Sequence, residues 1–205
     1  MREFIEKAMS FADYETMIDG LLAEGKTTGP VQSDEMYLYA KLNRQRMSRL
    51  EKTVELAPEA ADMLAQLDTD QYWLVITEGW CGDAAQNIPV IEKLASANDG
   101  IETRYLLRDE HPELIDQFLT NGARSIPVLI AVDKRSSRVL GRWGSRPKAA
   151  QDLFMQLKSL GLEKAEINEK LQRWYNEDRG RSLQFEIAEL AQGWAAKRSA
   201  AGERN

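Results

Sequence analysis

Residues 72–84 carry the most informative pattern in the chain: Tyr72-Trp73-Leu74-Val75-Ile76-Thr77-Glu78-Gly79-Trp80-Cys81-Gly82-Asp83-Ala84. The first six residues form a short, continuous apolar run that is rich in strand-favouring side chains. Such a run is typical of a strand buried on both faces of a sheet. A tryptophan–cysteine–glycine turn follows it, and the pattern then predicts a helix over residues 83–97 that ends at Asn98-Asp99-Gly100.

The downstream pattern alternates strands and helices. It predicts a strand at Ile101–Leu107, a helix at Pro112–Thr120, strands at Pro127–Val132 and Arg138–Trp143, and a helix that opens at Pro147 and ends near Gly161. The first two strands should be parallel, because a helix crosses between them. The last two should be antiparallel, because a short polar turn joins them. The sequence therefore predicts an α/β domain with a four-stranded mixed sheet and helices on both faces.

Helical segments flank this domain. Apolar residues at helical spacing predict an N-terminal helical extension over residues 1–69 and a C-terminal helical extension over residues 161–205, with the α/β domain between them at residues 70–160. The apolar stripes of the extensions need a partner surface. We therefore expect all three segments to pack as one compact unit.

The composition narrows the classes of partner and chemistry. The chain has 205 residues, a formal net charge of −6, one cysteine and one histidine. A negative balance argues against nucleic-acid and membrane partners, because their anionic surfaces bind basic proteins. A single cysteine excludes an intrachain disulfide. One cysteine and one histidine are too few ligands for a structural zinc site without several carboxylates. No run approaches the roughly 18 apolar residues of a membrane helix, and no secretory signal follows Met1, so we expect a cytoplasmic protein.

Several motifs resemble those of the thioredoxin-like superfamily. The turn from Trp80 to Ala84 resembles the thioredoxin W-C-G-P-C active-site turn, and Pro89 lies eight residues after Cys81, where thioredoxins kink this helix. The stretch 122–127 resembles the segment that places a cis-proline, here Pro127, beside the active site. The resemblance covers residues 70–160 and implies a thioredoxin fold. The Trp-Cys-Gly-Asp-Ala form is similar to that of a bacterial thioredoxin-like group.

Three positions depart from the thioredoxin pattern. Ala84 stands where thioredoxins carry the second, resolving cysteine, and Asp83 stands where they carry proline. Val75 replaces the buried acid that serves proton transfer to that second cysteine. The absence of both the second cysteine and the buried acid is chemically consistent, because without a second thiol there is no thiol proton for the acid to accept. The resemblance thus implies a monothiol site.

The resemblance implies roles for the residues of this site. Cys81 is the candidate catalytic residue, and the active-site turn comprises Trp80, Gly82, Asp83 and Ala84. At a helix N-terminus we expect the Cys81 thiol to be somewhat more acidic than a free cysteine, although Asp83 and Glu78 oppose this. Asp83 is either a partner of the helix dipole, a proton acceptor for Cys81, or an anchor for a substrate amide.

The candidate substrate-binding residues are Ile126 and Pro127. In this family a cis-proline lets the preceding residue present its backbone to an extended substrate as a short added strand. We therefore expect the Ile126–Pro127 bond to be cis, close to Cys81. Elsewhere, Arg108, Arg124 and Arg146 are either carboxylate anchors or solvated charges.

Two hypotheses for the function remain open. In the first, the protein is a single-cysteine thiol–disulfide oxidoreductase: Cys81 attacks a protein or small-molecule disulfide, and an outside thiol releases the product. No bound cofactor is expected, and glutathione or another low-molecular-weight thiol would be the co-substrate. In the second, the protein is a redox-inactive binding module of thioredoxin fold or a cysteine redox sensor.

Overall fold

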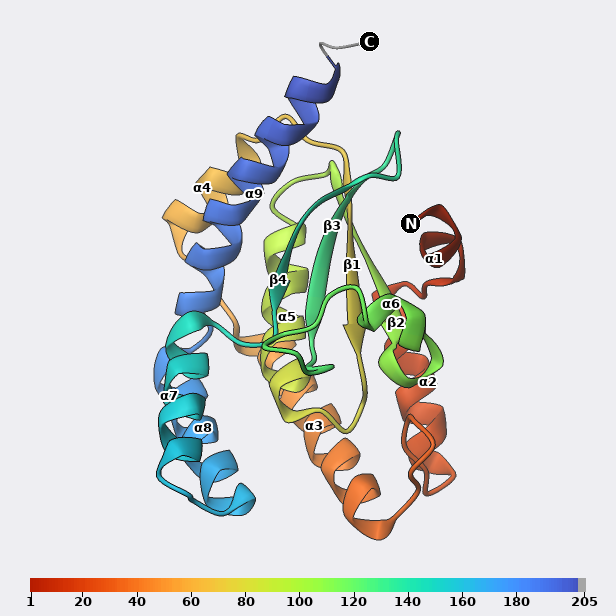
Figure 1. Cartoon of the computed structure of the whole chain (residues 1–205), viewed down its shortest axis with the longest axis vertical. Helices are drawn as coiled ribbons and strands as arrows, with labels where there is room; N and C mark the ends of the chain where they lie inside the picture. Colours follow the sequence, from red (N-terminus) through yellow and green to blue (C-terminus); the bar gives the residue numbers. More distant parts are fainter. Residues whose placement is uncertain (203–205) are drawn as a thin grey trace.

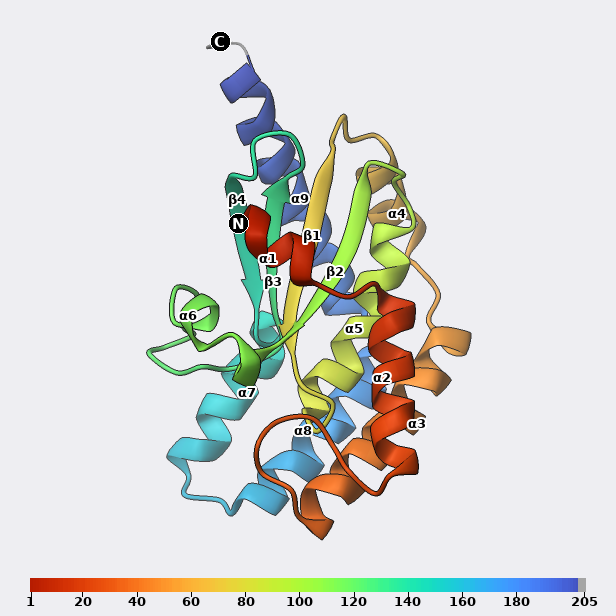
Figure 2. The same ribbon diagram turned by 90° about the vertical axis from the view of Figure 1, so that its right-hand side faces the viewer.

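The computed structural model describes residues 1–202, with side chains as far as Arg198. In this part of the chain a four-stranded mixed sheet has the order β2-β1-β3-β4 (Figures 1 and 2). The strands are β1 (Gln71–Thr77), β2 (Ile101–Leu107), β3 (Val128–Asp133) and β4 (Val139–Gly144). β1 pairs in parallel with β2 and antiparallel with β3, and β3 pairs antiparallel with β4. The predicted fold class and strand directions are confirmed.

β1 is an interior strand of the sheet, and both of its faces are covered. Trp73, Leu74, Val75 and Ile76 are all fully buried. A continuous apolar run rather than an alternating one is what such a strand requires. A short turn connects β1 to α5 (Gly82–Ala95). The buried face of α5 packs on the sheet.

Helices lie on both faces of the sheet. α5, α4 (Pro58–Ala65) and α9 (Arg181–Gly202) cover one face, while α1 (Arg2–Lys7) and α6 (Pro112–Ile115) lie against the other, as Figures 1 and 2 show. α2 (Phe11–Ala23) packs beside the edge strand β2, where Tyr14 stacks on Tyr105 with ring centroids 5.2 Å apart. α3 (Asp34–Thr53) packs along α5.

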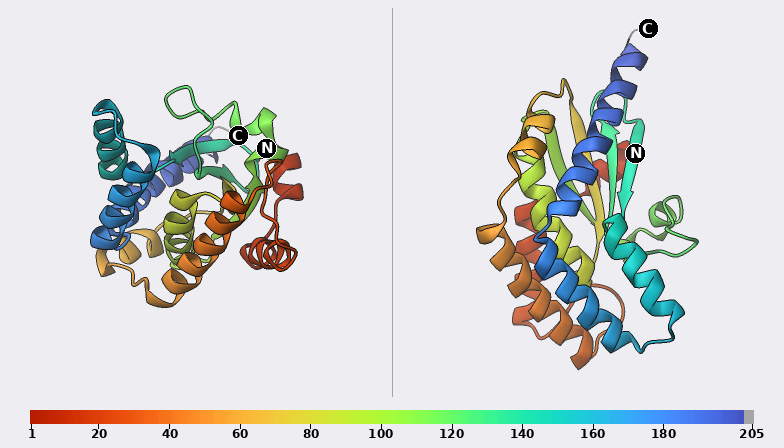
Figure 3. Two further views of the ribbon diagram at one scale, coloured as in Figure 1. Left: turned by 90° about the horizontal axis from the view of Figure 1, so that it is seen from below. Right: turned by 90° about the vertical axis from the view of Figure 1, so that its left-hand side faces the viewer.

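The helix over the last strands comes from the C-terminal end of the chain. α9 crosses the sheet beside β4 (Figure 3), and its Trp194 meets Trp73 edge to face with ring centroids 6.1 Å apart. α7 (Lys148–Ser159) and α8 (Lys164–Asp178) instead form a helical hairpin beyond the end of the sheet. This hairpin has a small cluster of its own, with Leu157, Ile167 and Leu171 buried.

The predicted helix over 112–120 is wrong in length. α6 ends at Ile115, and the N–H groups of Gln117 and Phe118 bond to carbonyls three residues back, which tightens the chain into a turn. Asp116 then reaches out of the helix to make a two-point ion pair with Arg124. The other predicted helices and strands of the domain are present, and their ends lie within two residues of the predicted ones.

Candidate functional site

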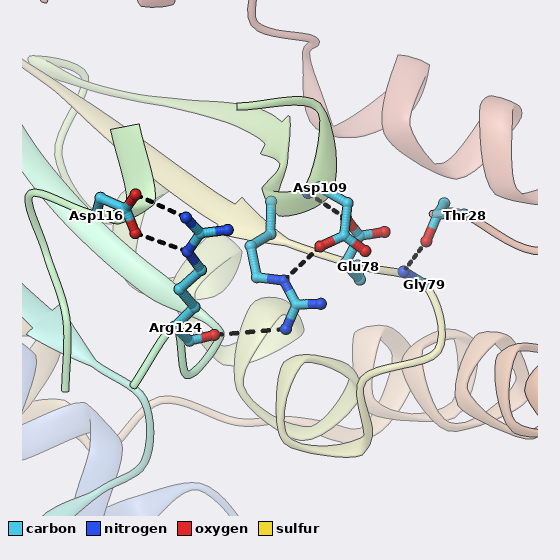
Figure 4. A network of polar contacts seen from close by, with 7 residues as sticks. Thr28, Glu78, Gly79, Asp109, Asp116 and Arg124 are labelled. Atoms are coloured by element: carbon cyan, nitrogen blue, oxygen red, sulfur yellow. Dashed lines mark hydrogen bonds and ion pairs between the residues drawn. The ribbon is translucent and has the colours of Figure 1, made fainter. Parts of the chain in front are cut away.

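The turn between β1 and α5 is held by the N-terminal helical segment. The Gly79 N–H donates to Thr28 Oγ1 at 2.9 Å (Figure 4), and Asn43 Nδ2 of α3 donates to the Gly79 carbonyl at 3.2 Å. The Cys81 N–H bonds to the Glu78 carbonyl at 3.1 Å and closes the turn. Cys81 is thereby fixed as the N-cap residue of α5.

The cysteine and the proline segment lie side by side. The Ile126–Pro127 peptide bond is cis. The Cys81 Sγ donates to the Ile126 carbonyl at 3.4 Å, and only 8% of the Cys81 surface is exposed. Three predicted site residues from two distant parts of the sequence are therefore brought together at one end of the sheet.

The expectation of a slightly acidic Cys81 thiol is wrong. Burial raises the pKa of Cys81 to about 12, and the Asp83 carboxylate adds to the rise. The backbone N–H groups of Ala84 and Asp83 lower the pKa, as expected at a helix N-terminus, but they do not outweigh the loss of water. Cys81 is therefore a neutral thiol at neutral pH in this conformation.

Asp83 is held by side chains from outside its own helix. Its carboxylate pairs with Arg146 Nη2 at 2.5 Å and accepts the Tyr175 hydroxyl of α8 at 2.8 Å. Asn87 Nδ2 donates to the Asp83 carbonyl at 2.8 Å and to the Tyr175 oxygen at 3.2 Å. Burial raises the pKa of Asp83, while Arg146 and Tyr175 counteract that rise. The C-terminal helical segment is thus attached to the active-site turn.

Gly82 and Ala84 complete the turn. Ala84 is 1% exposed, so the position of the second thioredoxin cysteine is filled by a buried methyl group. Gly82 faces α3: a Cβ there would lie 3.8 Å from Arg46 Nη1 and 3.9 Å from Asn43 Oδ1. The turn therefore lies directly against a cationic side chain that the sequence does not link to it.

A cleft of about 540 Å³ opens around these residues. Trp80, Cys81, Gly82, Asp83 and Ile126 line it, together with Tyr175 from α8 and Asn43 from α3. Five cationic side chains also line it, which we call the cationic rim: Arg46, Arg108, Arg124, Arg146 and Lys164. Asp83 is the acidic residue of the lining in the described part of the chain. The lining of the cleft therefore has more cationic than acidic side chains, although the chain carries a net charge of −6.

A polar network orders the wall beside Trp80 (Figure 4). Arg108 lies over the Trp80 ring, 4.8 Å from its centroid, and bonds to Asp109 at 2.7 Å and to the Arg124 carbonyl at 3.4 Å. The Asp109 N–H donates to the buried Glu78 carboxylate at 2.9 Å. Burial raises the pKa of Glu78. Arg108 and Arg124, for which the sequence left open a role as carboxylate anchors or as solvated charges, are thus held beside the cleft by partners within the protein.

The sequence analysis missed Arg46 and the role of Tyr175. On α3, Arg46 belongs to a run of charges typical of a solvated face, and Tyr175 belongs to an apolar cluster typical of packing. Both reach the site only because α3 and α8 fold back beside α5. No pattern within either helix marks these contacts.

Residues 1–202 contain neither a candidate metal site nor a candidate membrane span. No cluster of three or more His, Cys, Asp or Glu side chains there could hold a metal ion. No helix there is both long enough and apolar enough to cross a membrane.

Comparisons with known proteins agree with the fold. A family model described as "Thioredoxin" matches residues 29–159. No curated protein matches the chain. A crystal structure of a protein of unknown function from Pseudomonas aeruginosa, PA1234, is similar with a TM-score of 0.64 at 16% identity, covering 94% of this chain and 96% of that one.

A second solved structure has the same fold. It is an HIV epitope-scaffold, similar with a TM-score of 0.56 at 17% identity, and the match covers 90% of this chain and 99% of the scaffold. At identities of 16% and 17%, both similarities support only the assignment of the fold. The family model, by contrast, spans more than half of the sequence, including the active-site turn and the cis-proline segment. The chain therefore belongs to the thioredoxin family.

Proposed function

We propose that this protein is a single-cysteine thiol–disulfide oxidoreductase that works through Cys81. The supporting observation is the placement of Cys81: its thiol is at the N-terminus of α5, beside cis-Pro127, in the wall of a cleft large enough for a small molecule or a peptide segment. The partner is a protein or small-molecule thiol or disulfide.

The proposed exchange has two steps. Cys81 loses its proton to solvent, attacks one sulfur of a disulfide R–S–S–R and forms Cys81–S–S–R, while R–S⁻ leaves and takes up a proton. Ala84 has no sulfur to break that bond, so an outside thiol attacks it, forms a new disulfide with R and returns Cys81 to the thiol. Glutathione or another low-molecular-weight thiol of a reducing cytoplasm would serve as the outside thiol.

One observation favours a second candidate function. Burial raises the pKa of Cys81 to about 12, which leaves little thiolate at neutral pH. A redox-inactive protein-binding module would use the same cleft and the Ile126 backbone without covalent chemistry. In a redox sensor, the thiol would react only when the partner or the oxidant displaces the local contacts.

Restoring the missing thiol tests the mechanism. Wild-type protein is expected to be inactive or very weak in insulin reduction with dithiol recycling. Ala84→Cys places a thiol one turn along α5 from Cys81 and should gain activity, because the mixed disulfide can then be broken internally. Ala95→Cys, also buried but at the far end of α5, is the matched control and should gain none. Wild-type activity as high as that of Ala84→Cys would contradict the single-cysteine mechanism.

Trapping separates the two candidate functions. After a thiol-blocking quench, wild-type protein incubated in mildly oxidised cell extract should carry reducible covalent adducts, because nothing within the chain releases them. Cys81→Ser should carry none, since Cys81 is the chain's single cysteine. If wild type forms no adducts while Cys81→Ser retains the same partners without covalent bonds, the binding-module function replaces the oxidoreductase.

A further inference from the structure

The cleft at Cys81 continues into a groove between α3 and α8. This groove has a volume of about 500 Å³ and shares Tyr39, Arg46, Asn168 and Gln172 with the cleft. Its lining residues come from α3 and α8. These two helices lie side by side in the right-hand view of Figure 3. A ligand that reaches Cys81 can therefore extend from the cleft into the groove, past the side chain of Arg46.

Arg46 is a partly desolvated cation without a counter-ion. Its Nη1 donates to Asn43 Oδ1 at 3.0 Å, and no carboxylate in the described part of the chain lies within ion-pairing distance. Burial lowers the pKa of Arg46, and the neighbouring positive charge of Arg49 lowers it further. A guanidinium taken out of water without an opposite charge is costly unless a ligand provides one.

The other arginines of the cationic rim already have partners. Arg108 pairs with Asp109, Arg124 with Asp116 and Arg146 with Asp83. Lys164 is exposed, so water screens its charge. Among the rim arginines of residues 1–198, Arg46 is thus the one whose positive charge an anionic ligand can pair with.

We infer that the groove between α3 and α8 is a carboxylate-binding subsite, in which Arg46 holds the acidic end of a carboxylate-bearing low-molecular-weight thiol or disulfide whose sulfur lies at Cys81. The inference rests on the proposed function for the chemistry at the sulfur. The planar guanidinium matches a carboxylate with two parallel hydrogen bonds, and the side-chain amides of Asn168 and Gln172 line the same groove. Arg46, Cys81 and Gly82 line one cleft, and a Cβ at Gly82 would lie 3.8 Å from Arg46 Nη1, so the two parts of the site are adjacent.

The first experiment uses a ligand that cannot react. S-methylglutathione carries two carboxylates and a blocked sulfur, and its binding is measured by titration calorimetry on the full chain. Wild type should bind it, and Arg46→Gln should lose about tenfold or more in affinity, the effect of one charged hydrogen-bonded contact. Lys52→Gln removes a positive charge from an exposed position of α3 that lines neither cavity, and it should bind like wild type. Equal melting temperatures of the variants show that Arg46→Gln is folded.

The second experiment follows the covalent step. Wild type should form mixed disulfides faster with glutathione disulfide than with cystamine, which has amino groups and no carboxylate, and Arg46→Gln should lose that preference. Equal rates with both disulfides in wild type, or no binding of S-methylglutathione, would overturn the subsite. Arg46-dependent binding without any adduct would instead retain the subsite and remove the oxidoreductase, so the two failures are distinguishable.

Discussion

The protonation state of Cys81 determines how fast this site can react. A group whose charged form is disfavoured by burial has a raised pKa, here about 12, so the thiolate fraction grows about tenfold with each pH unit below that value. Alkylation of Cys81 by iodoacetamide should therefore be slower at neutral pH than that of a free cysteine, and it should keep rising through about pH 10. Mass spectrometry of samples quenched at successive times measures the alkylation rate. A plateau below about pH 8 would show an acidic thiol and contradict the geometry.

Asp83 should control that thiol. Its carboxylate raises the pKa of Cys81, and its removal also frees Arg146, whose positive charge favours a thiolate. Asp83→Asn is therefore expected to increase the alkylation rate several-fold at fixed pH. Asp152→Asn, on the exposed side of α7, is the control and should leave the rate unchanged. A slower reaction in Asp83→Asn would mean that the carboxylate accepts the Cys81 proton, as one of the sequence hypotheses holds.

Tyr175 connects the active-site turn to α8 through its hydroxyl group. Tyr175→Phe leaves the buried Asp83 carboxylate without one hydrogen bond, which should lower the free energy of unfolding by about 1–3 kcal/mol. Urea denaturation gives this value. Tyr37→Phe removes a hydroxyl that makes no hydrogen bond within the described residues and should cost much less. Equal losses in both variants would show that the Tyr175 hydroxyl has no special role.

The site is only partly predictable from sequence, for a reason visible in these residues. Trp80, Cys81 and Pro127 belong to local patterns, so sequence analysis finds them. Tyr175 lies 92 residues from the carboxylate that it binds, and no periodicity within α8 indicates the contact. The thiol acidity was predicted wrongly because a helix N-terminus is recognisable in sequence, whereas the depth of burial is not.

Among the helices and strands, α9 and β4 approach each other closely at Gly141. A Cβ at Gly141 would lie 2.1 Å from Trp194 Nε1, so Gly141→Ala forces α9 away from the sheet. The free energy of unfolding should fall by about 2 kcal/mol or more. Gly193→Ala, on the open side of α9, meets no atom within 4 Å and should stabilise the protein by about 0.5–1 kcal/mol. Similar effects of the two substitutions would contradict the described packing.

The pattern of helices and strands was predicted more completely than their packing. The apolar run of β1 and the crossover helix after it specify strand directions, and these are confirmed. The end of α6 was missed because the apolar spacing continues as far as Phe118, while Asp116 leaves the helix to pair with Arg124. Which C-terminal helix covers the sheet depends on contacts such as Gly141 with Trp194, and helical periodicity does not encode these contacts.

The folded chain should open first at α7 and α8. The sheet, α5 and α9 share one large core, whereas the α7–α8 hairpin depends on a small cluster around Leu157 and on polar contacts to α5. Native-state hydrogen exchange is therefore expected to show lower protection for α8 than for β1 and α9, which should exchange together. Equal protection of α8 and β1 would mean that the groove beside Arg46 opens only with global unfolding.

Charge is distributed unevenly over the folded chain. The net charge of −6 argues against a polyanionic partner, yet the cationic rim brings together positive side chains from α3, α8, the 3-10 helix Arg108–Glu110 and two loops around Cys81. The net charge of the sequence does not reveal that these side chains gather around one cleft. It is the fold that makes an acidic protein present a positive cleft, which suits a small anionic thiol.

The most direct test of the proposed chemistry is intact-mass analysis of the protein with glutathione disulfide. At about pH 9, where more of the buried thiol is ionised, wild type should gain one glutathionyl group, and excess dithiothreitol should remove it completely. Cys81→Ser should gain nothing under the same conditions. A wild-type protein that stays unmodified at that pH, while still folded and still binding S-methylglutathione, would contradict a thiol–disulfide exchange at Cys81.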